Sequence, residues 1–233
     1  MRVSKIICSL ATVFMFETSF AGSPIPAEET CPIGGEVFEI TSTPSCSSMG
    51  HTMSLKAITS CDFVTHLPVC PSNQLPMYKS FSDVEIPTLK ALIETKEYEN
   101  WKNYTPYYRA YLIEEKFSEP DSVAQFFVLQ TGIWFDPTNT LTDTRYLEAY
   151  HKSRTKAFAT DKVEDAKFWL GAEAMVFLHE ARLEMARANL TEMKNSDNGE
   201  NAYFTEYVEM LEKCISNYSD DEFVCEMDTP ISK

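Results

Sequence analysis

Hydrophobic and polar positions follow two different patterns along the chain, and the change comes at about residue 81. From residue 31 to 80, short apolar runs alternate with polar residues, as in 36–40 and 51–58, and turn-forming residues separate them. This alternation is typical of short strands and predicts a β-ribbon. Residues 22–30, which precede the ribbon, contain prolines and predict a flexible lead-in.

Beyond residue 81 the apolar residues recur every three or four positions, which predicts helices. Ser82 and Glu85 have the spacing of a capping box, and Thr105 before Pro106 marks a second helix start. The predicted helices span 83–97, 106–117, 121–134, 143–158, 161–190 and 200–216. The longest is apolar on two sides, so we expect it to pack between neighbouring helices. Residues 81–216 therefore predict an array of antiparallel helix pairs similar to tetratricopeptide repeats (TPR-like).

The first 21 residues have the features of a secretory signal peptide. Arg2 and Lys5 precede an apolar run over 6–16, and small residues end the segment at Ala21. The run is too short to cross a bilayer. We therefore expect the chain from Gly22 onward to be exported, to the bacterial periplasm or the exterior, with no membrane span.

The chain is strongly acidic, with a formal net charge of −15. Loss of Arg2, Lys5 and Glu17 with the signal peptide removes a net +1 and leaves −16. A surface of this charge repels nucleic acid and anionic lipid, so we expect no nucleic-acid partner. The acidic residues are dense from 192 to 228, where they predict a solvated face or, alternatively, a docking surface for a basic partner.

Six cysteines remain after removal of the signal peptide, and an even number in an exported protein indicates disulfides. They are Cys31, Cys46, Cys61, Cys70, Cys214 and Cys225. Four of them lie within forty residues of one another, and two lie together near the end of the chain. This clustering predicts a Cys214–Cys225 disulfide in an acidic C-terminal tail over residues 217–233.

Two cysteine-proline turns, CPIGG at 31–35 and CPSN at 70–73, each look like half of a zinc knuckle. A knuckle has two cysteines three positions apart, but Gly34 and Asn73 stand at the second positions here. With CPIGGEVFE, LPVCPSNQLPMY and the helical stretch that follows, residues 31–115 resemble a bacterial family of uncharacterised proteins. That family has a zinc-ribbon-like segment followed by TPR-like helices. The resemblance implies an architecture and a metal site, of which only Cys31 and Cys70 match, and it implies no activity.

In a ribbon of this kind the two turns face each other, and an exported protein meets oxidising conditions. We hypothesise that nested Cys31–Cys70 and Cys46–Cys61 disulfides replace the metal as the staple of the ribbon. In the chain-entropy model, each would contribute roughly 3–4 kcal/mol to stability.

The alternative hypothesis keeps a metal in the ribbon. Cys31 and Cys70, together with His51 and His66, would supply the ligands of a Cys2His2 zinc site. Because exported thiols usually oxidise, we favour the disulfides and expect no cofactor.

Signals for catalysis are few. The seven glycines form no phosphate-binding loop and no Gly-x-Ser-x-Gly elbow. The stretch HEARLE at 179–184 lacks the second histidine of a zinc-protease helix. We interpret His151, with Glu148 and Arg154, as a group of paired side chains on the surface of one helix.

The aromatic run 98–113 contains the candidate binding residues Trp101, Tyr107 and Arg109, which could line a groove for a peptide or sugar. The near-helical spacing of its aromatic residues favours core packing instead.

Together these patterns predict an α+β protein, with a small disulfide-stapled β-ribbon at 31–80 and a mainly α-helical TPR-like domain at 81–216. We expect a non-enzymatic accessory protein that binds another protein or peptide, because this is what helical arrays commonly do. The alternatives are a metal-binding ribbon protein and a hydrolase of the cell envelope.

Overall fold

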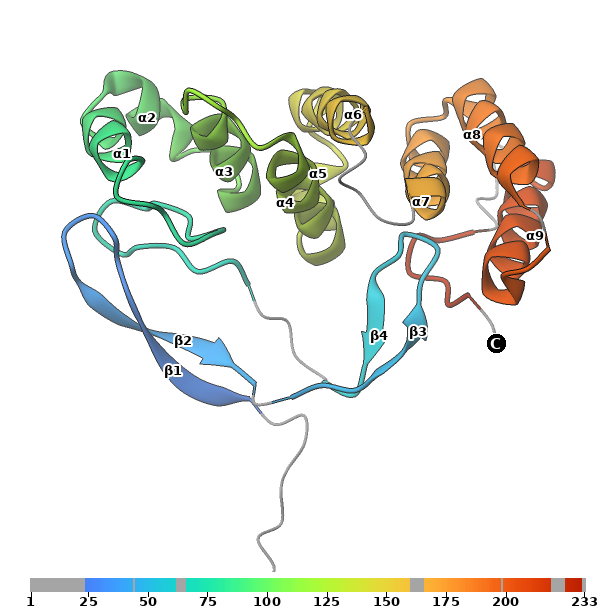
Figure 1. Cartoon of the computed structure of the whole chain (residues 1–233), viewed down its shortest axis with the longest axis horizontal. Helices are drawn as coiled ribbons and strands as arrows, with labels where there is room; N and C mark the ends of the chain where they lie inside the picture. The colour runs from blue at the N-terminus through green and yellow to red at the C-terminus, as the bar shows by residue number, and fades with distance from the viewer. Residues whose placement is uncertain are drawn as a thin grey trace, which may run out of the picture.

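The computed structural model describes residues 24–43, 45–61, 66–159, 166–197, 199–218 and 225–231. The expected signal peptide lies outside the described residues. In the part that is described, two antiparallel hairpins are joined to nine helices, which confirms the α+β class. The helices follow one another in a row from α1 to α9, and both hairpins lie on the same side of this row (Figure 1). No helix in the described ranges is long and apolar enough to cross a bilayer.

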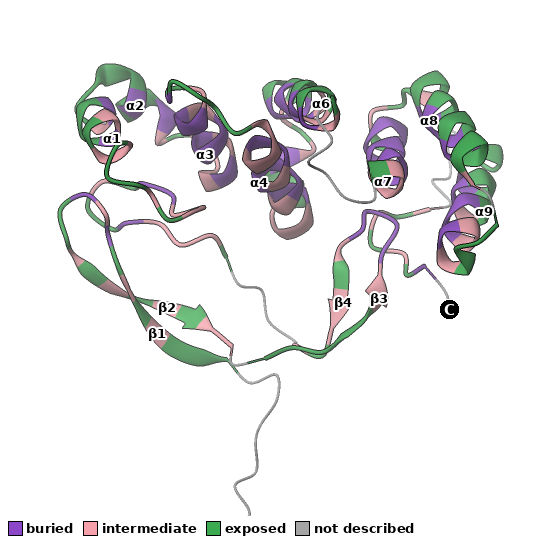
Figure 2. Cartoon of the chain, viewed as in Figure 1, coloured by how far each residue is buried: buried purple, intermediate pink, exposed green. Residues whose placement is uncertain are grey.

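The first hairpin pairs β1 (Ile25–Thr30) with β2 (Val37–Ser42), in a register that runs from Ile25 opposite Ser42 to Thr30 opposite Val37. The expectation of a flexible lead-in is therefore wrong for residues 25–30. Although Pro26 is a poor strand residue, an edge strand tolerates it because its outward side needs no N–H donor. No residue of either strand is buried, and Figure 2 shows both strands in the colours of exposed and intermediate residues.

The second hairpin pairs β3 (Ser48–His51) with β4 (Ala57–Thr59). Its turn brings Met53 and Leu55 into the core. The C-terminal segment 225–231 lies along this turn: the Met53 N–H donates to the Thr229 carbonyl at 2.8 Å, and the Ile231 N–H donates to the His51 carbonyl at 2.9 Å. Residues 225–231 are thus part of the packed structure and do not form a free tail.

The helical region begins at residue 86. Its helices are α1 (Ile86–Ile93), α2 (Lys96–Trp101), α3 (Pro106–Glu114), α4 (Ser122–Phe135), α5 (Pro137–Thr140), α6 (Thr144–Phe158), α7 (Ala166–His179), α8 (Leu183–Ser196) and α9 (Ala202–Ser216). The predicted cap of α3 is present, since the Tyr108 N–H donates to Thr105 Oγ1 at 3.2 Å. The helix predicted over 83–97 is two helices, because Thr95 caps α2 by accepting a hydrogen bond from the Tyr98 N–H.

The helix predicted over 161–190 is also two helices, α7 and α8. The chain turns at Ala181, whose φ of 57° lies in the left-handed region. The Arg182 N–H donates to the Phe177 carbonyl at 2.8 Å, which is the closing hydrogen bond of a Schellman cap. Glycine is the usual residue at such a position, so the alanine concealed the break from the sequence pattern.

The core consists of three adjoining clusters along the row. The first joins the two cysteine-proline turns to α1 and α2, the second lies between α3, α4 and α6, and the third joins α7, α8 and α9 to the β3–β4 turn. Close approach of α7 and α9 depends on Gly171, where an added β-carbon would lie 2.5 Å from the Tyr207 ring. The contacting helix pairs include α1 with α2, α3 with α4, α4 with α6, α7 with α8 and α8 with α9. The more specific TPR-like architecture stays a prediction.

Candidate functional site

The two cysteine-proline turns face each other and are joined by a Cys31–Cys70 disulfide, with a Cα–Cα distance of 5.6 Å. Each turn is closed by its own backbone hydrogen bonds, from Gly35 N–H to the Cys31 carbonyl and from Gln74 N–H to the Cys70 carbonyl. Both cysteines are buried. This pair is the one that the sequence analysis hypothesised.

Asn73, at the position of a missing knuckle cysteine, links the two turns by hydrogen bonds. Its amide nitrogen donates to the Ile33 carbonyl at 3.1 Å, and its side-chain oxygen accepts from the Leu75 N–H at 2.9 Å. Glu36 adds a second link, because its carboxylate accepts from both the N–H and the hydroxyl of Ser72. Hydrogen bonds therefore connect the turns where metal coordination connects them in a zinc knuckle.

The residues at the turns do not fit the zinc site that the resemblance implies. The Cys31 and Cys70 sulfurs lie within 4.8 Å of a Glu36 carboxylate oxygen, but a disulfide offers no thiolate to a metal. His51 lies in β3, with its Nδ1 3.4 Å from the Tyr203 hydroxyl of α9, and belongs to the other hairpin. The alternative hypothesis of a zinc site at Cys31, Cys70, His51 and His66 is therefore wrong.

The structure contains two further disulfides. Cys46–Cys61 lies at the base of the β3–β4 hairpin, with a Cα–Cα distance of 5.6 Å. Cys214–Cys225 joins the end of α9 to the C-terminal segment, with a Cα–Cα distance of 5.4 Å. The second of these bonds holds residues 225–231 against the β3–β4 turn.

The candidate binding residues of the aromatic run are part of the core. Trp101, Tyr107 and Arg109 are 7%, 3% and 4% exposed, so they line no open groove. The Arg109 guanidinium donates to the carbonyls of Lys102 and Tyr104 and thereby holds the loop before α3. The groove alternative is wrong for these three residues, and the core packing that the near-helical spacing favoured is confirmed for Trp101.

A polar cluster joins the turn region to the helices around Glu114, which is buried. Lys79 Nζ lies 2.7 Å from a Glu85 oxygen and 2.8 Å from a Glu114 oxygen, and the Tyr78 hydroxyl donates to Glu114 at 2.6 Å. Burial, with the hydrogen bond to Glu114, raises the pKa of Tyr78 well above its ordinary value. Burial opposes ionisation of Glu85, but hydrogen bonds from Lys79 and Ser82 outweigh it and lower the pKa of this carboxyl. These contacts anchor the segment before α1 to α3.

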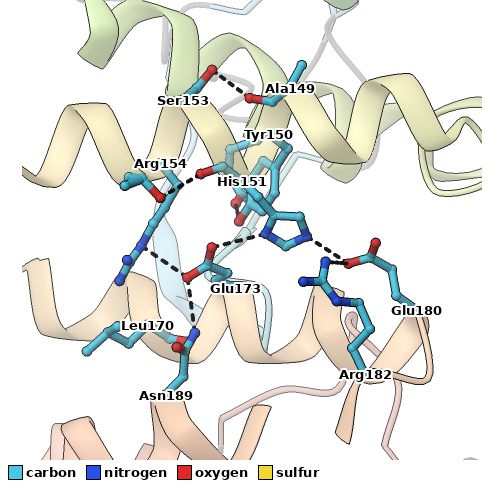
Figure 3. A network of polar contacts seen from close by, with 12 residues as sticks. Ala149, Tyr150, His151, Ser153, Arg154, Leu170, Glu173, Glu180, Arg182 and Asn189 are labelled. Atoms are coloured by element: carbon cyan, nitrogen blue, oxygen red, sulfur yellow. Dashed lines mark hydrogen bonds and ion pairs between the residues drawn. The ribbon is translucent and has the colours of Figure 1, made fainter. Parts of the chain in front are cut away.

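A second polar network lies between α6, α7 and α8 (Figure 3). His151 is placed between two carboxylates, with Nδ1 3.0 Å from Glu173 and Nε2 2.7 Å from Glu180. Arg154 Nε lies 3.1 Å from Glu173, and the Asn189 amide donates to the same carboxylate at 3.1 Å. The predicted surface group of His151 with Glu148 and Arg154 is therefore wrong, because both basic side chains turn towards α7.

The network is suited to holding helices together. Both ring nitrogens of His151 face carboxylates, and the ring stacks on Phe177 with centroids 4.3 Å apart. Glu173 is 4% exposed, accepts a hydrogen bond from the Asn189 amide, and lies beside His151 Nδ1 and the Arg154 guanidinium, so its negative charge is compensated. No nitrogen of this histidine is free to act on a substrate, and we assign the network a structural role.

An open pocket of about 220 Å³ lies between α4, α5, the end of α7 and the C-terminal segment. We call it the Trp134 pocket; its lining residues are Ser54, Ile133, Trp134, Pro137, Leu141, His179, Glu226, Met227 and Asp228. The position of Trp134 is fixed by its indole N–H, which donates to the Ser54 carbonyl at 2.9 Å. The position of the C-terminal wall is fixed by the Ser54 N–H, which donates to the Met227 carbonyl at 3.0 Å.

The Trp134 pocket combines an apolar lining with two carboxylates. Glu226 and Asp228 flank Met227 on the C-terminal wall. Lys56 Nζ lies 3.8 Å from Asp228 and 5.5 Å from the centre of the Phe135 ring, so a cation of the chain itself already lies between a carboxylate and an aromatic ring at this place. This composition favours a ligand with a positive charge and an aliphatic stem.

Sequence reasoning missed the Trp134 pocket. The acidic stretch over 192–228 and the Cys214–Cys225 disulfide were both predicted, and the disulfide returns the chain only to the end of α9. No pattern in the sequence indicates that Met227 would meet Trp134 across about ninety residues of chain.

Comparisons of the chain with protein families, with curated proteins and with solved structures find no match.

Proposed function

We propose that this chain is an exported, non-enzymatic binding protein, and that its partner is a basic protein or peptide. The observation that carries the proposal is the Trp134 pocket, in which an apolar lining meets the carboxylates of Glu226 and Asp228. A lysine or arginine side chain buries its methylene stem on apolar surface while its charged head stays at a carboxylate rim. The pocket thus suits one cationic side chain of a partner.

The net charge of the chain also supports a basic partner. The whole chain has a net charge of −15, and such a field attracts a basic partner from a distance and increases the rate of encounter. The three disulfides support export, because such bonds persist in oxidising compartments. We also propose that the helices form a TPR-like array, an architecture that commonly binds other proteins.

The direct test uses a fluorescein-labelled Gly-Ser peptide that contains two arginines, with a citrulline peptide as the uncharged match. We expect the arginine peptide to bind the chain from residue 22 onward, as measured by fluorescence anisotropy at low salt. Removing both pocket charges with Glu226→Gln and Asp228→Asn should weaken binding several-fold, up to about tenfold, since both carboxylates are exposed and each exposed charge pair contributes roughly 0.2–1 kcal/mol.

The matched control is Glu148→Gln, which removes one exposed carboxylate on α6, away from the pocket. It should leave the affinity within about twofold. Equal binding of the arginine and citrulline peptides, or equal loss in the control and the pocket variants, would contradict a specific cationic site. In the second case, the general acidic field alone would account for binding.

A further inference from the structure

The outer edge of β2 is an unpaired strand edge. The first sheet has two strands in the order β1–β2, so β2 has a partner on one side within the described residues. No hydrogen bond joins the backbone of Val37–Ser42 to any described residue outside β1. A two-stranded hairpin is marginally stable in water, whereas a third strand makes such a sheet stable. This edge is therefore ready to accept another strand.

The composition of β2 favours strand addition more than that of β1. Its residues include Val37, Phe38, Ile40 and Thr41, which are of the types that strands prefer. Every residue of β2 has a backbone N–H, while Pro26 removes one donor from the β1 side. Of the two edges of the sheet, β2 is the one with a complete row of donors and acceptors.

The exposed face of the hairpin indicates what kind of strand would bind. Glu28 lies directly opposite Glu39, and both are exposed, so two like charges face each other across the sheet. Such a pair is destabilising, and a lysine or arginine beside Glu39 on an added strand would relieve it. Val37, at the same face, is 59% exposed and offers apolar contact.

We infer that the outer edge of β2 binds an extended, basic segment of a partner protein as a third strand. Main-chain hydrogen bonds would provide affinity, and basic side chains next to Glu39 would provide specificity. A second copy of this chain is a poor occupant, because its own glutamates would come to lie beside Glu39 and add to the repulsion. Charged residues on an edge act against self-association, and here the same charges select the opposite sign.

The test uses a seven-residue fluorescein-labelled peptide in which lysine alternates with valine and threonine. The matched peptide has the same sequence, with N-methyl groups on alternate backbone amides to block strand addition. We expect binding of the first peptide, protection of β2 amides from hydrogen exchange, and at least tenfold weaker binding of the methylated peptide. Glu39→Lys should weaken binding by about tenfold, since it turns an attractive cross-strand pair into a repulsive one. Glu148→Lys makes the same charge change on α6 and should have a small effect.

The inference rests on the proposed function in one respect, which is that the partner is basic. The two sites are separated by their variants: Glu226→Gln with Asp228→Asn should leave binding of the strand peptide unchanged. If the peptide binds but the β2 amides stay unprotected, or if Glu39→Lys and Glu148→Lys act equally, the strand site is refuted and the pocket proposal stands. Sedimentation of the peptide-free chain as a dimer that Val37→Lys dissociates would also refute it, because a second copy would then occupy the edge.

Discussion

The first hairpin has two strands of six residues and the second has strands of four and three residues, and the two are attached to the molecule in different ways. In the first, no residue of β1 or β2 is buried, and the hairpin is fixed at its turn by the Cys31–Cys70 disulfide. In the second, the turn itself is buried: Met53 is 0% exposed, and its carbonyl accepts the Tyr207 hydroxyl at 2.6 Å. A short hairpin has too little core of its own and needs an anchor; the first is fixed to another segment by a disulfide beside the buried Ile33, and the second by its buried turn residues Met53 and Leu55.

The largest expected effect comes from removing the covalent anchor. The Cys31→Ala and Cys70→Ala double variant opens a loop with a sequence separation of 39, which the chain-entropy model values at roughly 4 kcal/mol. Hydrogen exchange should show loss of protection in β1 and β2 while β3 and β4 remain protected. The matched variant, Cys46→Ala with Cys61→Ala, opens a loop with a sequence separation of 15 and should cost roughly 3 kcal/mol. Equal loss of protection in both hairpins would mean that the two anchors are not independent.

The next effect comes from the hydrophobic anchor of the second hairpin. Met53→Ala removes a fully buried side chain and should lower the free energy of unfolding by about 3 kcal/mol. Ile40→Ala, in the uncovered first hairpin, should cost under about 1 kcal/mol, because Ile40 is only partly buried. Urea unfolding of the two variants measures both values. A similar loss for each would mean that the β2 strand contributes as much to the core as the turn of the second hairpin.

Sequence patterns predicted the types of most elements of this fold, but not where some of them break or begin. The switch at residue 81, the Thr105 cap and the α+β class follow from local patterns, which the sequence contains directly. The break at Ala181 and the strand over 25–30 were missed, because an alanine at a left-handed position and a proline-containing strand contradict local propensity. In both cases tertiary contacts outweigh the preference of single residues.

The candidate sites were harder to predict for the same reason. The partners of His151 lie on α7 and just beyond its end, more than twenty residues away, so spacing along α6 gave the wrong pair. Trp101 is buried with α1 and the cysteine-proline turns, as the near-helical spacing of the aromatic run favoured, whereas Tyr107 is buried against α4 and α6, which the run does not specify. The Trp134 pocket requires the C-terminal segment to cross the molecule, and no local signal contains that information.

A smaller effect distinguishes the cores behind the two hairpins by pH. The Tyr98 hydroxyl, in the core of the first, has no hydrogen-bond partner in the described part of the chain, and burial raises the pKa of Tyr98 to about 12. The pKa of Tyr98 in the folded state exceeds its unfolded value near 10. The contribution of Tyr98 to the free energy of unfolding is therefore complete below pH 10 and is lost as pH rises towards 12, because the unfolded chain ionises first. Tyr98→Phe should be neutral at pH 7 and should recover on the order of 2 kcal/mol at pH 12.

Tyr207→Phe is the matched variant in the core of the second hairpin. It removes the hydrogen bond to the Met53 carbonyl and should cost about 1 kcal/mol at pH 7 already. Urea unfolding of both variants at pH 7 and at alkaline pH provides the comparison. Equal losses at pH 7 would show that Tyr98 has an unseen partner, and would remove this difference between the cores.

The smallest effect concerns the like-charged pair on the exposed face of the first hairpin. Glu28→Gln removes one of the two charges that face each other and should stabilise β1–β2 by a few tenths of a kcal/mol, up to about 1 kcal/mol. Hydrogen exchange of β2 amides at low salt measures this gain, which added salt should reduce because screening weakens the repulsion in the parent chain. Glu184→Gln, an exposed and charge-matched change on α8, should leave β2 exchange unaffected. If Glu28→Gln accelerates exchange instead, the glutamate stabilises the hairpin, and the charge pair then gives no reason for a basic strand to bind beside Glu39.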